Sequence, residues 1–206
     1  MLIEYPDSTF QRQTKIASVS PRLRASVQDF SCPLLRYNGS MAIKDSLLPE
    51  YDHELATTRR LLERVPEAEF SWKPHPKSMS LGQLAGHCAN IPFWCSATLE
   101  MASYDLERGD PEAKLDVPPS RDTLLKEFDR KVATARESLA KATDAEMMAP
   151  WTLKSGDHVI FTMPRVSAVR SFVMNHLIHH RGQLSVYLRM KDVPLPPIYG
   201  PTADEQ

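Results

Sequence analysis

The chain has 206 residues, of which 42% are hydrophobic and 25% are charged. That is enough apolar material for one core, and the length argues against two full domains. The 25 basic and 26 acidic side chains leave a formal net charge of -1, which gives no basic field for binding nucleic acid. No stretch is long and apolar enough to cross a membrane and no signal-peptide pattern opens the chain, so we expect a cytoplasmic protein.

The first forty residues differ from the rest of the chain. They carry five basic and three acidic side chains among short apolar pieces, with no sustained helical period. We expect residues 1–40 to be an N-terminal extension that is poorly ordered or not native, with Met41 as the natural start and residues 41–206 as one domain. The three cysteines, Cys32, Cys88 and Cys95, match no zinc or disulfide pattern and are expected to be free thiols.

Periodic apolar residues after Met41 predict a first helix. It is expected to begin at Asp45 or Ser46, with Pro49 tolerated in its first turn, and to end before Pro66. Its buried stripe is formed by Leu48, Tyr51, Leu55, Thr58 and Leu62.

A second helix is expected to begin after Ser80, because Gln83 three residues later completes a capping box. Pro92 lies inside this helix and predicts a kink. The apolar face consists of Leu81, Leu84, Cys88, Ile91, Cys95, Leu99 and Ala102.

The second half of the chain predicts two more helices and a short hairpin. Ser120 caps a third helix that ends near Ala142, residues 150–162 resemble a hairpin, and Pro164 opens a fourth helix that runs to about Met190. Four helices of about twenty residues predict an all-α four-helix bundle with long crossover connections.

Two of the seven histidines stand out by their position on the fourth helix. With Val169 as the reference angle, His176 and His180 fall at the centre of the core-facing stripe and His179 at its edge. Buried imidazoles need partners, and an i, i+4 pair can bind one divalent ion. Two hydrogen-bonded core histidines are the alternative. The other candidates, His53, His75 and His158, occupy polar or loop positions where solvated side chains are expected.

A third ligand is expected from the second helix, where His87 lies inside the apolar arc. A lone histidine there is more often a core residue, but His87, His176 and His180 together would leave open coordination positions, as in a catalytic metal site. Cys88 and Cys95 are a rival ligand set that fits better as buried core residues.

Four further polar or aromatic residues are candidates for supporting roles. Arg181 and Gln183 could orient a substrate or cap the end of the bundle, although solvated side chains are the expected outcome. Asp52 is a candidate partner for a ligand histidine, with an ordinary surface carboxylate as the favoured alternative. Trp72 would either wall the site or plug the end of the bundle.

From about Leu48 to its end, the chain resembles the DinB/YfiT-like metal-dependent proteins. The matching stretches are WKP at 72–74, SMSLGQL at 78–84 followed by His87, NHLIHHRGQL at 175–184 and PIYGP at 197–201. The resemblance implies a four-helix bundle, frequently a homodimer, with a divalent metal on His87, His176 and His180. It also implies a small-molecule substrate and, in some relatives, a low-molecular-weight thiol as co-substrate.

These features favour a metal-dependent enzyme, either a thiol-dependent transferase or a hydrolase, in which zinc or nickel activates a thiolate or water. The residues between the paired histidines are Leu177, Ile178 and His179, so the HExxH pattern of metalloproteases is absent. A non-enzymatic metal-stabilised bundle in stress response or partner binding is the alternative, and a metal-free bundle is a third possibility. Metal affinity is predicted to fall below about pH 6, where protons compete for the imidazoles.

Overall fold

The computed structural model describes residues 41–113 and 117–205. The expectations for residues 1–40, including the free thiol of Cys32, lie outside these ranges. Among the described residues, no helix is both long and apolar enough to cross a membrane.

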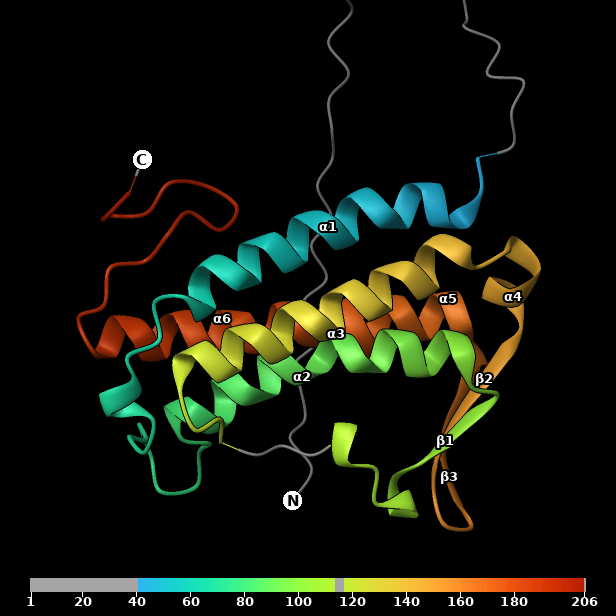
Figure 1. The fold of residues 1–206 in the computed structure, drawn as a ribbon, viewed down its shortest axis with the longest axis horizontal. Coiled ribbons are helices and arrows are strands. Elements are labelled where there is room, and N and C mark those ends of the chain that lie inside the picture. The colour runs from blue at the N-terminus through green and yellow to red at the C-terminus, as the bar shows by residue number, and fades with distance from the viewer. Residues whose placement is uncertain (1–40, 114–116, 206) are drawn as a thin grey trace, which may run out of the picture. The chain divides into compact units, whose positions relative to one another are not determined.

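Most of the described chain is helical, and its long helices lie side by side (Figure 1). Each of α1, α2, α3 and the last helix contacts at least two of the others. The long helices are α1 (Ile43–Leu62), α2 (Leu81–Glu100), α3 (Arg121–Lys141) and a last helix over residues 165–190 that consists of α5 (Arg165–Ala168), η4 (Val169–Met174) and α6 (Asn175–Met190). The short helices are η1 (Glu67–Glu69), η2 (Leu106–Arg108), η3 (Pro111–Ala113) and α4 (Asp144–Met148).

A small sheet adjoins one end of the helices and corrects the expectation of an all-α fold. The predicted hairpin is present as β2 (Pro150–Ser155) and β3 (His158–Pro164), and its turn uses Gly156 at a φ of +56°. The unpredicted strand β1 (Ser103–Asp105) pairs in parallel with β2, giving the order β1-β2-β3. Three residues directly after a helix carry no strand signal of their own, because their partner strand lies far along the chain.

The observed helix starts show where the capping residues alone predicted the first residue of a helix. The Ser80 hydroxyl accepts a hydrogen bond from the Gln83 amide at 3.1 Å, and Ser120 caps α3 in the same way, both as predicted. The start of α1 was predicted too late. It begins at Ile43, whose N–H donates to the Asp144 carboxylate of α4 at 2.8 Å, so a distant side chain supplies the cap. Pro49 therefore lies in the second turn of α1, beyond the predicted first turn.

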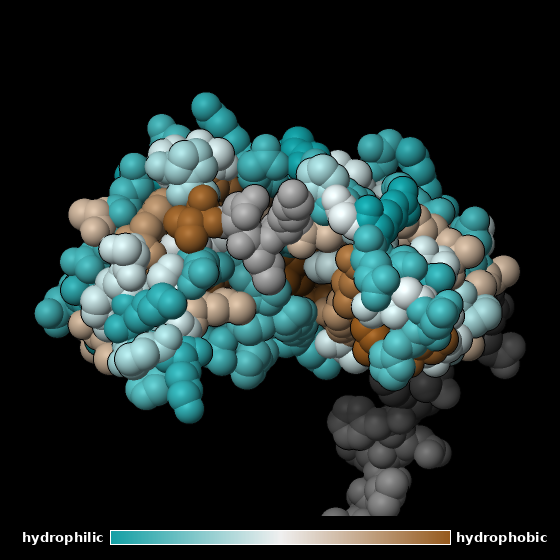
Figure 2. Space-filling view, turned by 90° about the horizontal axis from the view of Figure 1, so that it is seen from below, coloured by the Kyte–Doolittle hydropathy of each residue, from teal (hydrophilic) through white to brown (hydrophobic). Residues whose placement is uncertain are grey.

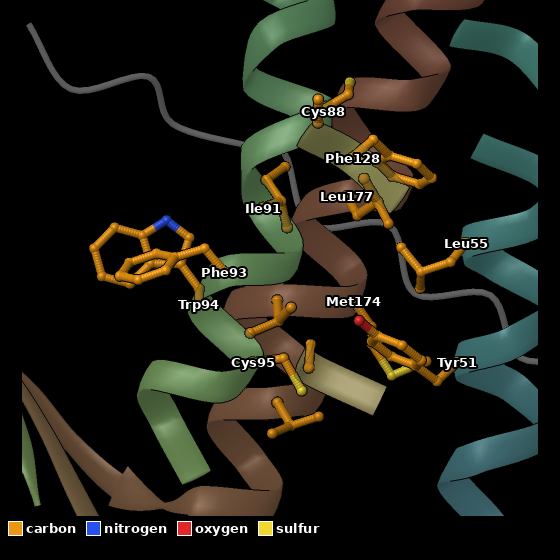
Figure 3. Packing of buried hydrophobic residues seen from close by; sticks show 14 of the residues in the cluster. Tyr51, Leu55, Cys88, Ile91, Phe93, Trp94, Cys95, Phe128, Met174 and Leu177 are labelled. Atoms are coloured by element: carbon orange, nitrogen blue, oxygen red, sulfur yellow. The ribbon is translucent and has the colours of Figure 1, made fainter. Parts of the chain in front are cut away.

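The core lies between the long helices. Figure 3 shows Tyr51 of α1, Ile91 and Cys95 of α2 and Met174 of the last helix pointing into a shared interior. Trp94 points to the other side of α2, where it packs edge-on against Tyr104 of β1. The outer surface seen in Figure 2 is mainly hydrophilic, with hydrophobic residues in small groups. The buried core thus holds the helices that carry the histidines in fixed positions.

Candidate metal centre

The last helix changes its winding just before the histidines. Residues Val169–Met174 form a π-helical segment, in which each turn takes one additional residue, so the residues after it are rotated relative to a regular α-helix. The buried face after this segment consists of Leu177, Arg181, Leu184 and Leu188. His176 and His180 consequently lie half-buried on the flank of that face, and the prediction that they occupy its centre is wrong.

The rotation turns the two histidines of α6 toward α2, where His87 is 8% exposed. The Nε2 atoms of His87 and His176 are 3.1 Å apart, and one nitrogen from each of His87, His176 and His180 can be chosen so that all three lie within 4.8 Å of one another. Two imidazole nitrogens bound to one zinc ion at about 2.0–2.1 Å would lie about 3.3 Å apart in tetrahedral geometry. The structure thus brings together the three residues that the sequence selected.

Hydrogen bonding in the cluster leaves nitrogen lone pairs available. The Oε1 atom of Gln183 lies 2.8 Å from Nδ1 of His180 and can accept a hydrogen bond from its N–H group. Nε2 of His180 then keeps its lone pair for a metal ion. Within the described residues, the buried Nδ1 atoms of His87 and His176 have no hydrogen-bond partner. A hydrogen bond between His87 and His176 would give one nitrogen of each ring a partner. It would not explain why His180 also lies against them. The donor set therefore fits a divalent cation better than a hydrogen-bonded core pair.

The surroundings keep all three rings neutral. Burial lowers the pKa of His87 to about 3, and the neighbouring His180 and His176 act in the same direction. Burial also lowers the pKa of His176 and of His180, and the neighbouring His180 lowers that of His176 further; at His180 the Gln183 side chain opposes the effect. Neutral imidazole is the form that binds metal, so the metal-free site is prepared for an ion at neutral pH.

Aromatic side chains lie against the cluster and along the cavity beside it. The Phe172 ring, from the π-helical segment, stacks on His176 with a centroid distance of 6.0 Å and an interplanar angle of 26°. Tyr187 lines a cavity next to His180. Trp72 packs edge-on against Tyr187 at 5.6 Å, so it backs the wall of this cavity without being one of its lining residues.

The expectation of a solvated Arg181 is wrong. Its side chain is 1% exposed and forms an ion pair with Glu54 of α1 at 2.6 Å, while the Tyr199 hydroxyl donates to the Glu54 carboxylate at 3.0 Å. A sequence signal for this pair existed, because Glu54 shares the helical spacing of the buried residues Tyr51 and Thr58. Gln183 is exposed, as expected, yet its side chain forms a hydrogen bond with His180. Its position three residues after His180 was the sequence feature that could have predicted this contact.

The remaining candidates are outside the cluster. Asp52 pairs with Arg136 of α3 at 2.7 Å and is the surface carboxylate of the favoured alternative, with no histidine contact. Cys88 and Cys95 are buried, and burial raises the pKa of each thiol to about 12, which makes them core residues and poor metal ligands. The other described histidines are exposed, as expected for His53, His75 and His158; His179, predicted at the edge of the core-facing stripe, is exposed as well.

Comparison with known proteins places this fold and site in one family. The family model described as the DinB superfamily matches residues 50–184. The uncharacterized protein YrdA of Bacillus subtilis (strain 168) is 24% identical over 169 residues, which cover 78% of this chain and 90% of YrdA.

Two solved structures have a similar fold. A DinB-like protein from Bacillus cereus ATCC 10987 has a TM-score of 0.60 at 24% identity, and the match covers 77% of this chain and 98% of that protein. The DinB-like protein YjoA of Bacillus subtilis has a TM-score of 0.59 at 18% identity and covers 75% and 98% respectively. Since the family model spans more than half of the sequence and includes all three histidines, the chain belongs to the DinB superfamily.

Proposed function

We propose that this protein is a metal-dependent enzyme on a DinB-type four-helix bundle, either a thiol-dependent transferase or a hydrolase. His87, His176 and His180 would hold one divalent ion, with zinc or nickel as the candidates. The observation that carries the proposal is the convergence of three imidazole nitrogens within 4.8 Å, next to a cavity that reaches His180.

The chemistry follows from this donor set. Three neutral nitrogen ligands leave coordination positions open, and a divalent ion there lowers the pKa of water toward about 7 or favours a thiol as its thiolate. Gln183 fixes the proton of His180 on Nδ1, while the Phe172 ring fixes the plane of His176. Leu84, at 1% exposed, contributes an apolar side chain to the cavity beside the site.

Elemental analysis tests the metal. Protein purified without a His-tag should contain about one divalent ion per chain, or take it up on addition, and His180→Ala should lose it. No stoichiometric ion, even after metal addition, would overturn the proposal.

A second measurement separates an enzyme from a metal-stabilised scaffold. Turnover of a low-molecular-weight thiol with an electrophilic acceptor, and hydrolysis of activated esters and amides, should both be compared for the wild type and His180→Ala. Loss of turnover at a temperature where the variant stays folded supports catalysis. Unchanged turnover contradicts it and favours the non-enzymatic alternative.

We also propose that residues 41–206 form the folded domain and that it assembles as a homodimer. A chain beginning at Met41 should unfold cooperatively and bind one ion per chain. Sedimentation velocity should give twice the mass of one chain, and a monomer at all concentrations would contradict the dimer.

A further inference from the structure

A cavity of about 200 Å³ lies between α6, the start of α2 and the loop before α2. It is smaller than the roughly 300–1,000 Å³ of pockets for drug-sized ligands, so it suits a small chemical group. Four other cavities have none of the three histidines in their lining. The lining residues of the cavity beside His180 are Ser78, Met79, Leu84, His180, Gln183 and Tyr187.

The lining of this cavity contains no Asp, Glu, Lys or Arg side chain. A charged group entering it would lose water without gaining a counter-charge from any lining side chain; an ion on the histidines would attract an anion only, and removing either charge from water is costly. Hydrogen-bonding capacity is nevertheless present, because neither the Ser78 hydroxyl nor the Gln183 amide nitrogen has a hydrogen-bond partner within the described part of the chain. The cavity therefore offers apolar contact together with a few hydrogen bonds for an uncharged group.

The Tyr187 side of the cavity is held in place before any ligand arrives. The Tyr187 hydroxyl donates to the Met79 carbonyl at 3.4 Å, and the Tyr187 ring packs against Trp72. Lys191 lies 5.4 Å from the centroid of the Trp72 ring and forms an ion pair with Glu69 at 3.0 Å. Its ammonium group is therefore paired outside the cavity. Met79 is 36% exposed and carries a flexible thioether, so it forms the adjustable rim.

We infer that this cavity receives a small uncharged group of the substrate or co-substrate, and that Met79 and Tyr187 are its specificity-determining residues. The inference rests on the proposed function, because it places this group within reach of an ion held by the three histidines. Tyr187 limits the depth available to the group, and Met79 limits its width at the rim.

The experiment uses the protein loaded with Co²⁺, whose absorption reports sulfur binding without requiring turnover. Three thiols with the same propyl chain serve as probes, ending in a hydroxyl, a sulfonate or an ammonium group. After correction for the thiolate fraction of each, the hydroxyl-bearing probe should bind about tenfold more tightly than either charged probe. Met79→Trp should fill the rim and weaken binding of that probe by about tenfold, with the cobalt spectrum of the free protein unchanged.

Met148→Trp is the matched control, because Met148 is 58% exposed on α4 and does not line the cavity. This variant should bind the three probes as the wild type does. Equal affinities for the three probes, no binding of any of them, or a Met79→Trp variant that behaves like Met148→Trp would overturn the inference. Failure of Co²⁺ to bind, or its retention by His180→Ala, would instead overturn the proposed function.

Discussion

His180 and Arg181 are neighbours on α6, yet they occupy opposite kinds of polar environment. Arg181 faces α1, where Glu54 pairs with its buried guanidinium, and the guanidinium also donates to the hydroxyl of Tyr199 in the segment after α6. His180 faces His87 of α2 and lies beside His176 of its own helix, and its Nε2 atom has no hydrogen-bond partner within the described residues. A buried polar group whose partners are all internal is a structural element, whereas three imidazole nitrogens that converge with only one hydrogen-bonding contact among them fit a cation site.

The largest expected effect is a loss of stability when Arg181, the structural member of this comparison, is replaced. Arg181→Met leaves the Glu54 carboxylate, 7% exposed, without its counter-charge, and should reduce the free energy of unfolding by about 3–5 kcal/mol in urea denaturation. The double variant Glu54→Leu with Arg181→Met should recover most of the loss. As a control, Arg136→Met removes an exposed pair with Asp52 and should cost less than about 1 kcal/mol. Equal losses for the two arginines would contradict the assigned roles.

The second prediction concerns metal binding by the three histidines. His176→Ala should weaken zinc binding by more than about 100-fold, because it removes one of three donors. Competition with a chelator measures the affinity. His179→Ala is the matched control, since His179 is exposed and adjacent to the cluster but is not one of its three donors. If His179→Ala lost as much affinity as His176→Ala, the assignment of the three ligands would be wrong.

A smaller effect is expected from Gln183, which contacts the site only through His180. Gln183→Leu removes the acceptor for the Nδ1 proton and should weaken zinc binding by about 10–100-fold. Gln183→Glu keeps an acceptor and should restore the affinity. A leucine variant with wild-type affinity would show that the hydrogen bond does not position the ring.

The smallest effect concerns pH and the metal-free protein. The pKa of His87 is about 3 in the folded chain and 6.5 in the unfolded chain, so between these values the unfolded state binds a proton that the folded state excludes. The free energy of unfolding should therefore fall as the pH decreases from about 6.5 toward 3. His87→Gln should show a shallower decrease over that window, and parallel curves for the two proteins would contradict the neutral buried imidazole.

The pH behaviour also sharpens the prediction made from the sequence alone. Proton competition was expected below about pH 6 from an ordinary histidine. Because burial lowers the pKa of all three histidines, protonation of the metal-free site begins at lower pH, and metal affinity should persist further into the acidic range.

Local signals predicted several features correctly. Ser80 and Ser120 cap their helices because the capping hydrogen bonds join residues three positions apart. The hairpin of β2 and β3 likewise depends on a short turn at Gly156. The start of α1 and strand β1 were missed because their partners, Asp144 and β2, are distant in sequence.

The sequence by itself predicted which three histidines would lie together, since His176 and His180 are about one helical turn apart and His87 is the histidine on the apolar arc of α2. Only the tertiary structure decided how they meet. The π-helical segment rotates α6 so that Arg181 turns inward to Glu54, 127 positions away, and the two histidines turn toward α2. Helical periodicity assumes a constant rotation per residue, whereas packing against α1 and α2 selects the rotation that satisfies both the ion pair and the imidazole cluster.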